Sequence, residues 1–255
     1  PLIFGHDVIH GYKTIFPIPL AESSSWDLDL MEKSARVAAT EASADGLNWT
    51  FAPMVDISRD ARWGRVMEGA GEDPYLGSLV AKARVHGFQG DNLNDINTIV
   101  ACAKHFAGYG FSEAGRDYNT TDFNQYTLHN TIMPPFKAAV DAGVRTFMNS
   151  FNTLDEIPAT GHKHIQRDIL KGDWSFDGFI VSDWGSIDQM IPHGFARDGK
   201  HAAELAVLAG SDMDMESSLY VSQLVGLVES GNIAEELLND AVRRILRVKY
   251  ELGLF

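Results

Sequence analysis

Residues 99–106 read IVACAKHF, an apolar run that changes abruptly to a lysine and a histidine. A short apolar run of this kind, with polar residues on either side, is typical of a strand buried on both faces. Five further runs resemble it, at residues 2–5, 47–55, 144–151, 179–182 and 210–215, although the last is weak. We therefore expect six strands.

The segments between these runs have helical spacing. Residues 74–88 are the clearest example, because Asp73 can cap the first turn and Pro74 suits the first helical position. We expect Gly87 and Gly90 to end this helix. A last helix over residues 234–252 has an apolar stripe that should face the sheet, with Gly253 as its stop signal. The stripe comprises Leu238, Ala241, Val242, Ile245, Val248 and Leu252.

Strands that alternate with helices predict a parallel sheet with right-handed crossovers. The chain has 255 residues, and a closed β/α barrel typically needs about 250. We predict a TIM-type β/α barrel, with residues 1–255 forming a single catalytic domain of a longer enzyme. Six strands fall short of eight, so we expect the barrel to be incomplete at its N-terminus. A doubly wound open sheet is the alternative.

Composition narrows the classes of ligand. The formal net charge is −14, which repels nucleic acid and anionic membranes, so we expect neither as a partner. No apolar run reaches the roughly 18 residues of a membrane-spanning helix. The single cysteine, Cys102, lies in an apolar run, where we expect a buried and inert thiol.

Catalytic residues of such folds lie at the carboxyl ends of the strands. Polar pairs follow three of the runs: His6-Asp7, Lys104-His105 and Asp183-Trp184. A charged loop at residues 59–73 follows another run. We assign most of its charges to structural ion pairs and expect Arg65 to be the exception.

These residues predict a site for a neutral, polyhydroxylated ligand such as a sugar. Carboxylates and cations can bind hydroxyl groups, and Trp184 can stack on a sugar ring. Retaining glycoside hydrolysis needs two carboxyl groups about 5 to 5.5 Å apart, one as nucleophile and one as proton donor. Asp183 is the best candidate for the nucleophile, with Lys104 and Arg65 keeping it ionised.

Five motifs together resemble the barrel domain of glycoside hydrolase family three, and specifically that of bacterial periplasmic-type β-glucosidases. They are Gly5-His6-Asp7-Val8-Ile9-His10-Gly11, Arg62-Trp63-Gly64-Arg65, Gly71-Glu72-Asp73-Pro74, Lys104-His105-Phe106 and Ser182-Asp183-Trp184. All occur in the order of the family. The resemblance implies a retaining enzyme, often exported to the periplasm or outside the cell, that releases terminal β-linked glucose without a cofactor.

The resemblance also implies a role for individual residues. Asp183 is the nucleophile, Trp184 borders the subsite, and four residues bind sugar hydroxyls: Asp7, Arg65, Lys104 and His105. The resemblance further offers Lys13, Arg116, Met148 and Phe151 as candidate substrate-binding residues.

The proton donor departs from this pattern. In two-domain glucosidases of the family it comes from a following domain, so we expect the acid to lie outside this chain. Another branch carries an Asp-His pair in the loop after the Lys-His motif, and residues 111–119 lack that pair. Glu113 and Asp117 are the fallback acids within the chain.

Two other functions stay open from the sequence. A metal-dependent hydrolase would use a ligand set drawn from His6, Asp7, His10, His105 and Asp183. Against it, the two histidines four residues apart would share a face only in a helix, whereas the flanking glycines indicate a loop. A non-catalytic sugar-binding barrel would keep the same residues without an acid.

Overall fold

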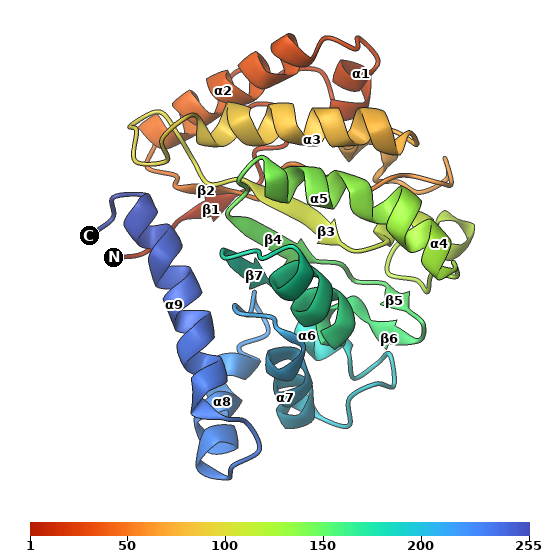
Figure 1. Cartoon of the computed structure of the whole chain (residues 1–255), viewed down its shortest axis with the longest axis vertical. Coiled ribbons are helices and arrows are strands. Elements are labelled where there is room, and N and C mark those ends of the chain that lie inside the picture. Colours follow the sequence, from red (N-terminus) through yellow and green to blue (C-terminus); the bar gives the residue numbers. More distant parts are fainter.

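The computed structural model describes all residues from 1 to 255 as a layered arrangement of short strands and surrounding helices (Figure 1). The strands are β1 (Gly5–His6), β2 (Trp49–Thr50), β3 (Cys102–Phe106), β4 (Thr146–Asn149), β5 (Thr153–Leu154), β6 (Ile157–Pro158) and β7 (Phe179–Val181). The α-helices are α1 (Pro19–Ser23), α2 (Leu28–Ala44), α3 (Pro74–Gln89), α4 (Gln125–Thr127), α5 (Met133–Asp141), α6 (Ser186–Gln189), α7 (Gly199–Ala209), α8 (Leu219–Glu229) and α9 (Glu235–Glu251). Two π-helical segments, Leu128–Ile132 and His164–Asp173, lie between them.

Six strand positions run parallel, as predicted for a β/α barrel. β1 pairs with β2, and β3, β4 and β7 form a three-stranded parallel sheet. Single bridges from Trp49 to Val100 and from Val181 to Met213 extend this order at both sides. No bridge joins Met213 to β1, so the sheet has a seam there. All carboxyl ends consequently face one rim, where the site is expected.

The first predicted strand is shorter and more exposed than expected. Its ladder begins at residue 5 rather than residue 2, and Leu2 and Phe4 are 71% and 55% exposed. These side chains lie beside the seam, where no further strand covers them. The hairpin of β5 and β6, an antiparallel pair, was not predicted, because each of its strands has only two residues.

Helix α3 confirms the prediction for residues 74–88, since the Asp73 side chain accepts hydrogen bonds from the backbone of Tyr75 and Leu76. Gly87 does not end the helix, which continues to Gln89 and stops at Gly90 with φ of +62°. Gly87 instead allows α3 to pack closely against α2, because a Cβ at this position would lie 2.5 Å from the Cβ of Ala35. Helices α2, α3 and α5 pack side by side over one flank of the sheet (Figure 1).

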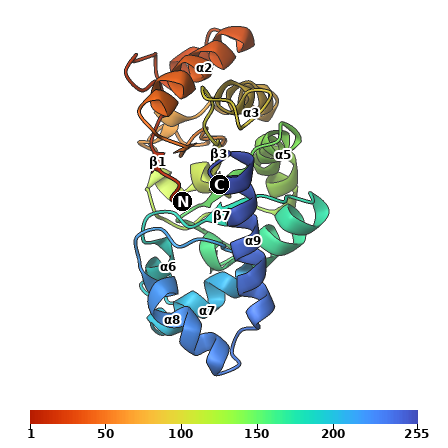
Figure 2. The same cartoon turned by 90° about the vertical axis from the view of Figure 1, so that its left-hand side faces the viewer.

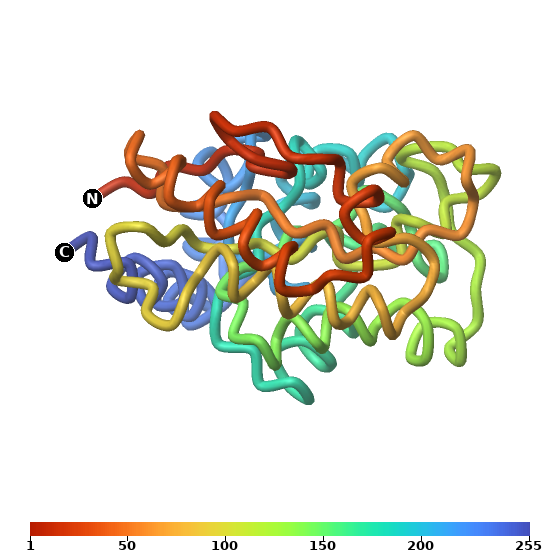
Figure 3. Tube along the Cα trace, turned by 90° about the horizontal axis from the view of Figure 1, so that it is seen from above, coloured from red at the N-terminus to blue at the C-terminus, as the bar shows by residue number.

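Helices α6, α7 and α8 lie below the strands in Figure 2, and α9 runs from that end up alongside the strands. The predicted stripe of α9 faces the sheet through Val248, which is fully buried against Trp49 and Cys102. The prediction is wrong for Val242, which is 51% exposed and does not face the sheet. The last turn of α9 lies beside the first residue, with Lys249 Nζ donating to the carbonyl of Pro1 at 3.1 Å, and the two termini lie together in Figure 3.

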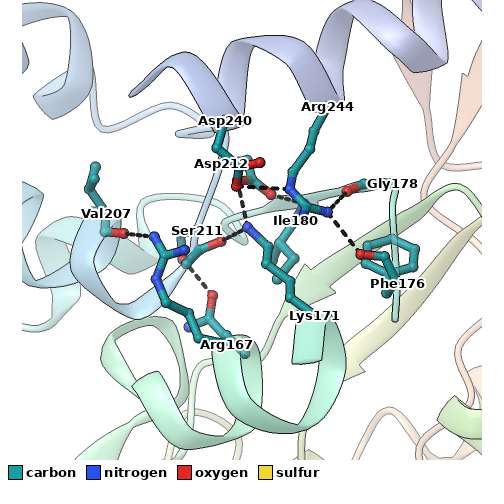
Figure 4. Close-up of polar contacts among 12 residues, drawn as sticks. Arg167, Lys171, Phe176, Gly178, Ile180, Val207, Ser211, Asp212, Asp240 and Arg244 are labelled. Atoms are coloured by element: carbon teal, nitrogen blue, oxygen red, sulfur yellow. Dashed lines mark hydrogen bonds and ion pairs between the residues drawn. The ribbon is translucent and has the colours of Figure 1, made fainter. Parts of the chain in front are cut away.

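A buried polar network fixes the segment at residues 210–215 beside β7 (Figure 4). Asp212 Oδ2 accepts the backbone N–H of Ile180 at 2.8 Å, and its Oδ1 lies 2.7 Å from Lys171 Nζ. Arg244 of α9 donates to the carbonyls of Phe176 and Gly178, just before β7. These side-chain bonds add to the backbone hydrogen bonds from Asp212 N and Met213 N to the carbonyl of Ile180 and from Ser182 N to the carbonyl of Met213.

Cys102 is buried, as the sequence predicted. The thiol is fully buried between β-strand neighbours, and burial raises its pKa to about 12. It is therefore protonated and unreactive at neutral pH. Among the helices, none combines the length and apolar character that crossing a bilayer demands.

Candidate active site

The carboxyl ends of the parallel strands surround a cavity of about 370 Å³. Such a volume suits a ligand the size of one sugar unit. Its lining mixes carboxylates, cations and aromatic rings: Gly5, Asp7, Phe51, Arg65, Lys104, His105, Met148, Asp183, Trp184 and Met215. Seven of the ten residues predicted for the site therefore lie together.

Asp183 lies two residues after β7, and the backbone around it is held in place by hydrogen bonds. Ser182 N donates to the carbonyl of Met213 at 2.8 Å, and Ser182 Oγ accepts from Met215 N at 2.8 Å. The Asp183 side chain accepts the backbone N–H of Trp184 at Oδ1, whereas Oδ2 is buried without a hydrogen-bond partner. One carboxylate oxygen is therefore oriented and the other is free.

The charge state of Asp183 results from opposing effects. Burial raises its pKa to about 6, although the Trp184 N–H, Lys104 and Arg65 each lower the pKa. The cations act in the predicted direction, but desolvation is larger than their combined effect. At neutral pH the carboxylate is still mostly ionised.

Lys104 and Asp7 form a pair across the cavity floor. The Lys104 side chain is 3% exposed, and its Nζ lies 3.4 Å from Asp7 Oδ1. A lysine at the end of a buried strand needs such a partner or an open cavity, and Lys104 has both. The remaining oxygen of Asp7 and the other N–H groups of Lys104 stay available to a ligand.

His105 lies beside the nucleophile candidate. Its Nε2 is 3.5 Å from Asp183 Oδ2, and its ring packs edge-on against Tyr109. Burial, with help from Arg65 and Lys104, lowers the pKa of His105 well below its usual value. The ring is therefore neutral in the free protein.

Asp56 is a residue that the sequence reasoning missed. It is buried, and its Oδ2 accepts the backbone N–H of His105 at 2.8 Å and faces Nδ1 at 2.9 Å. The signal was present, because Asp56 is the first polar residue after the run at 47–55. Asp183 was selected as a polar residue that follows an apolar run, and Asp56 meets the same criterion.

Arg65 enters the cavity from the charged loop after the second strand. Its guanidinium pairs with Glu68, with Nη2 to Oε2 at 2.6 Å, and lies over the ring of Tyr109. Arg62 instead pairs with Asp60 on the surface. The prediction for this loop therefore holds in part: Asp60, Arg62 and Glu68 form ion pairs, whereas Arg59, Glu72 and Asp73 form none. Arg65 reaches the cavity as predicted but is also ion-paired, so it is not an exception.

Trp184 borders the cavity and is 64% exposed, so its indole face is open to a ligand. Met148 lines the wall, as expected. Phe151 does not, because it is buried behind the wall against Trp63 and Tyr109. Phe151 therefore contributes to the packed interior and not to the cavity wall.

Lys13 and Arg116 also lie outside the cavity lining. Lys13 pairs with Asp45 on the surface, with Nζ to Oδ1 at 2.7 Å. Arg116 is exposed in the loop after β3 and contributes nothing to the lining. In that loop Asp117 accepts from Trp63 Nε1 at 2.8 Å and Glu113 is exposed, so neither fallback acid lines the cavity.

The ligand set of the alternative metal centre does not assemble. His6 is exposed, and His10 Nδ1 lies 2.9 Å from the carbonyl of Phe16 rather than toward the cavity. No three His, Cys, Asp or Glu side chains in the chain are grouped as metal ligands.

A second hollow of about 360 Å³ lies between α1 and α2. Its lining is mainly apolar, with one carboxylate and one ammonium group, Glu22 and Lys33. Glu22 is already paired with the buried Arg84 at 2.7 Å. The groups that reaction chemistry needs are therefore concentrated at the strand ends and not in this hollow.

Comparison with known proteins agrees with this geometry. Residues 1–248 match the family model described as Glycosyl hydrolase family 3 N terminal domain. The whole chain is 46% identical to a periplasmic beta-glucosidase of Salmonella typhimurium, covering 33% of that protein. A beta-xylosidase of Formosa agariphila is 34% identical over 96% of the chain, which covers 36% of that protein.

Among solved structures, a beta-glucosidase from Listeria innocua in complex with glucose superposes on the whole chain with a TM-score of 0.99. It is 49% identical, and the chain covers 36% of it. The chain thus spans about a third of the length of the relatives it matches.

Proposed function

The chain belongs to glycosyl hydrolase family 3, and from that premise we propose that it is the catalytic barrel of a retaining β-glucosidase with Asp183 as its nucleophile. One observation carries the proposal: Asp183 Oδ2 is buried, unpartnered and at the edge of a sugar-sized cavity. A carboxylate oxygen with no hydrogen bond keeps its electron pairs available for attack. Trp184 N–H, bound to Oδ1, fixes the direction of the group.

The reaction proceeds in two displacements. In the first, an oxygen of Asp183 attacks the anomeric carbon of the sugar while the bond to the leaving oxygen breaks and that oxygen takes a proton. In the second, water attacks the same carbon and gives a proton to the group that acted as the acid, while the bond to Asp183 breaks. Two inversions give net retention of configuration.

The other lining residues hold the sugar in place. Asp7 accepts hydrogen bonds from its hydroxyl groups, while Lys104 and Arg65 donate to them. Trp184, with its exposed ring, covers the apolar face of the sugar. Met148 forms part of the wall.

The proton donor is the part of the mechanism that these residues do not supply. Besides Asp183, only Asp7 contributes a carboxyl group to the lining, and Asp7 is paired with Lys104. We assign the acid to a domain that follows this one in the longer protein, in keeping with relatives three times its length. Residues 1–255 then form one domain of a multidomain enzyme.

Glucose is the proposed terminal sugar because the relative with 46% identity is described as a glucosidase, against 34% for the xylosidase. The substrate is accordingly a β-glucoside or a short β-glucan oligosaccharide. The description of the same relative as periplasmic supports a location in the periplasm or outside the cell.

Trapping with an activated 2-deoxy-2-fluoro-β-glucoside, followed by peptide mapping, tests the assignment in the complete enzyme. The expected result is a single fluoroglucosyl adduct on the peptide that carries Asp183. Asp188→Asn is the matched control, since Asp188 is an exposed carboxylate five residues further on, and it should label normally. Inhibitor binding without any adduct would instead favour a non-catalytic sugar-binding barrel.

A further inference from the structure

The two ring nitrogens of His105 have opposite surroundings. Nδ1 faces Asp56 Oδ2 at 2.9 Å, inside the protein. Nε2 faces Asp183 Oδ2 at 3.5 Å, at the cavity, and neither of these two atoms has a hydrogen-bond partner. Which nitrogen carries the hydrogen therefore decides what the cavity offers to a ligand.

The hydrogen-bond pattern around Asp56 places that hydrogen on Nδ1. Oδ2 of Asp56 accepts the backbone N–H of His105 at 2.8 Å and lies 2.9 Å from Nδ1 of the same residue, so Oδ2 is the acceptor for both groups. Burial raises the pKa of Asp56 to about 7, and the buried Oδ1, which has no hydrogen-bond partner, is the oxygen that can hold a proton while Oδ2 remains an acceptor. Asp56 consequently receives both the main-chain and the ring N–H of His105.

A neutral imidazole carries a single ring hydrogen. With that hydrogen on Nδ1, Nε2 presents a lone pair to the cavity, next to another acceptor, Asp183 Oδ2. Two buried acceptors that face each other lack the donor that buried polar groups require. A hydroxyl group of the ligand can supply a donor to Nε2 from the cavity.

We infer that Asp56 is a positioning residue that fixes the tautomer and direction of His105, so that Nε2 accepts a hydrogen bond from a sugar hydroxyl beside Asp183. The inference rests on the proposed function, because it takes the ligand to be a sugar. Asp56 does not line the cavity, so it acts only through His105.

The surrounding backbone holds Asp56 in this position. Val55 N donates to the carbonyl of Lys104 at 2.8 Å, and Met54 bridges to Lys104 in parallel register. Gly69 closes the other side, where an added Cβ would lie 3.2 Å from the carbonyl oxygen of Asp56. The relative position of Asp56 and His105 is therefore set by adjacent strands and not by a flexible loop.

The first experiment measures hydrolysis of aryl β-glucosides by the complete enzyme and its Asp56→Asn variant. Asparagine has the same shape but can donate to Nδ1, which moves the ring hydrogen to Nε2. We expect kcat/KM to fall roughly tenfold to a hundredfold, as for other partners that orient a functional histidine. Ser58→Ala is the matched control, because Ser58 is buried two residues away without a hydrogen-bond partner and its loss should leave kcat/KM unchanged.

A series of monodeoxy aryl glucosides then separates positioning from a general loss of structure. The ratio of wild-type to Asp56→Asn activity should collapse toward 1 for the glucoside that lacks the hydroxyl bound by Nε2. The same ratio for every member of the series would overturn the inference.

Nitrogen-15 NMR of the histidine side chains gives a second readout that needs no active variant, with His105→Gln used for assignment. We expect hydrogen on Nδ1 and none on Nε2 of His105 in the unliganded wild-type enzyme. Hydrogen on Nε2 would refute the inference even if Asp183 is labelled by the fluoroglucoside. Failure of that labelling in the wild type would instead refute the proposed function.

Discussion

Lys104 Nζ lies 3.4 Å from Asp7 Oδ1, although the lysine side chain is 3% exposed and the aspartate side chain is 63% exposed. The pair joins a buried side chain of β3 to a solvent-exposed side chain of the cavity lining. It therefore brings a cation close to Asp183 while leaving a carboxylate accessible from solvent. This arrangement places the ammonium group where it lowers the pKa of Asp183.

Replacing Lys104 with methionine should move the acid limb of the activity profile to higher pH. Lys104 lowers the pKa of Asp183, which burial has raised to about 6, so its removal raises that pKa further. An upward shift on the order of one pH unit is expected for loss of a neighbouring opposite charge. The measurement is kcat/KM against pH for an aryl glucoside.

Lys82→Met is the control for this experiment, because Lys82 is exposed on α3 and forms no ion pair. Its pH profile should match the wild type. An unshifted acid limb for Lys104→Met would show that Lys104 does not act on Asp183.

Asp183→Asn should separate activity from stability. Because Asp183 is the proposed nucleophile, kcat/KM should fall by roughly 10³-fold or more, equivalent to about 4 kcal/mol of transition-state stabilisation. The folded protein should gain stability at pH 7, because a carboxylate whose pKa is raised on folding disfavours the folded state once it ionises. Folding raises the pKa of Asp183 from 3.8 to about 6, so the gain in the free energy of unfolding is at most about 3 kcal/mol.

Thermal unfolding at two pH values checks the sign. The stability cost of Asp183 is absent below its unfolded pKa near 4 and develops as the pH rises through the folded value near 6. The variant should therefore melt at a higher temperature than the wild type at pH 7 and at nearly the same temperature at pH 4. A lower melting temperature at pH 7 would contradict this account.

Much of this site could be predicted because strand ends are visible in the sequence. Lys104, His105 and Asp183 each follow an apolar run at once, and parallel strands bring such positions to one rim. Phe151, which the resemblance offers as a substrate-binding candidate, instead lies in a packed aromatic cluster. Sequence spacing predicts which rim a residue reaches and not the side chain's final direction.

Other features depended on tertiary contacts. The hydrogen bonds between Asp56 and His105 join residues 49 positions apart, so no local sequence pattern predicts them. Gly87 resembled a helix stop until its contact with α2 was known. Met213 forms a single bridge, and the side chains of Asp212 and Lys171 add to the backbone hydrogen bonds between this segment and β7.

Breaking the Lys171–Asp212 pair should destabilise the protein strongly. Both side chains are buried, at 6% and 3% exposed, so Lys171→Met leaves Asp212 charged without its partner. Loss of one member of a buried pair typically costs roughly 3–5 kcal/mol. The double variant Lys171→Met/Asp212→Asn should recover part of this loss, as measured by denaturant unfolding.

Lys200→Met, an exposed change on α7, is the control and should leave stability within about 0.5 kcal/mol of the wild type. Equal losses for the two lysine variants would show that the pair does not stabilise the fold.

Gly87→Ala tests the packing of α2 on α3. An added Cβ would lie 2.5 Å from both the Cβ of Ala35 and the carbonyl oxygen of Glu32, so the helices must separate. Overpacking of this kind typically costs about 1–3 kcal/mol. Gly226→Ala in α8 is the opposite case, because nothing lies within 4 Å of its Cβ and alanine favours a helix by about 0.5–1 kcal/mol. The two substitutions should therefore shift the unfolding midpoint in opposite directions, and a stabilising Gly87→Ala would show that the interface of α2 and α3 is looser than the contacts indicate.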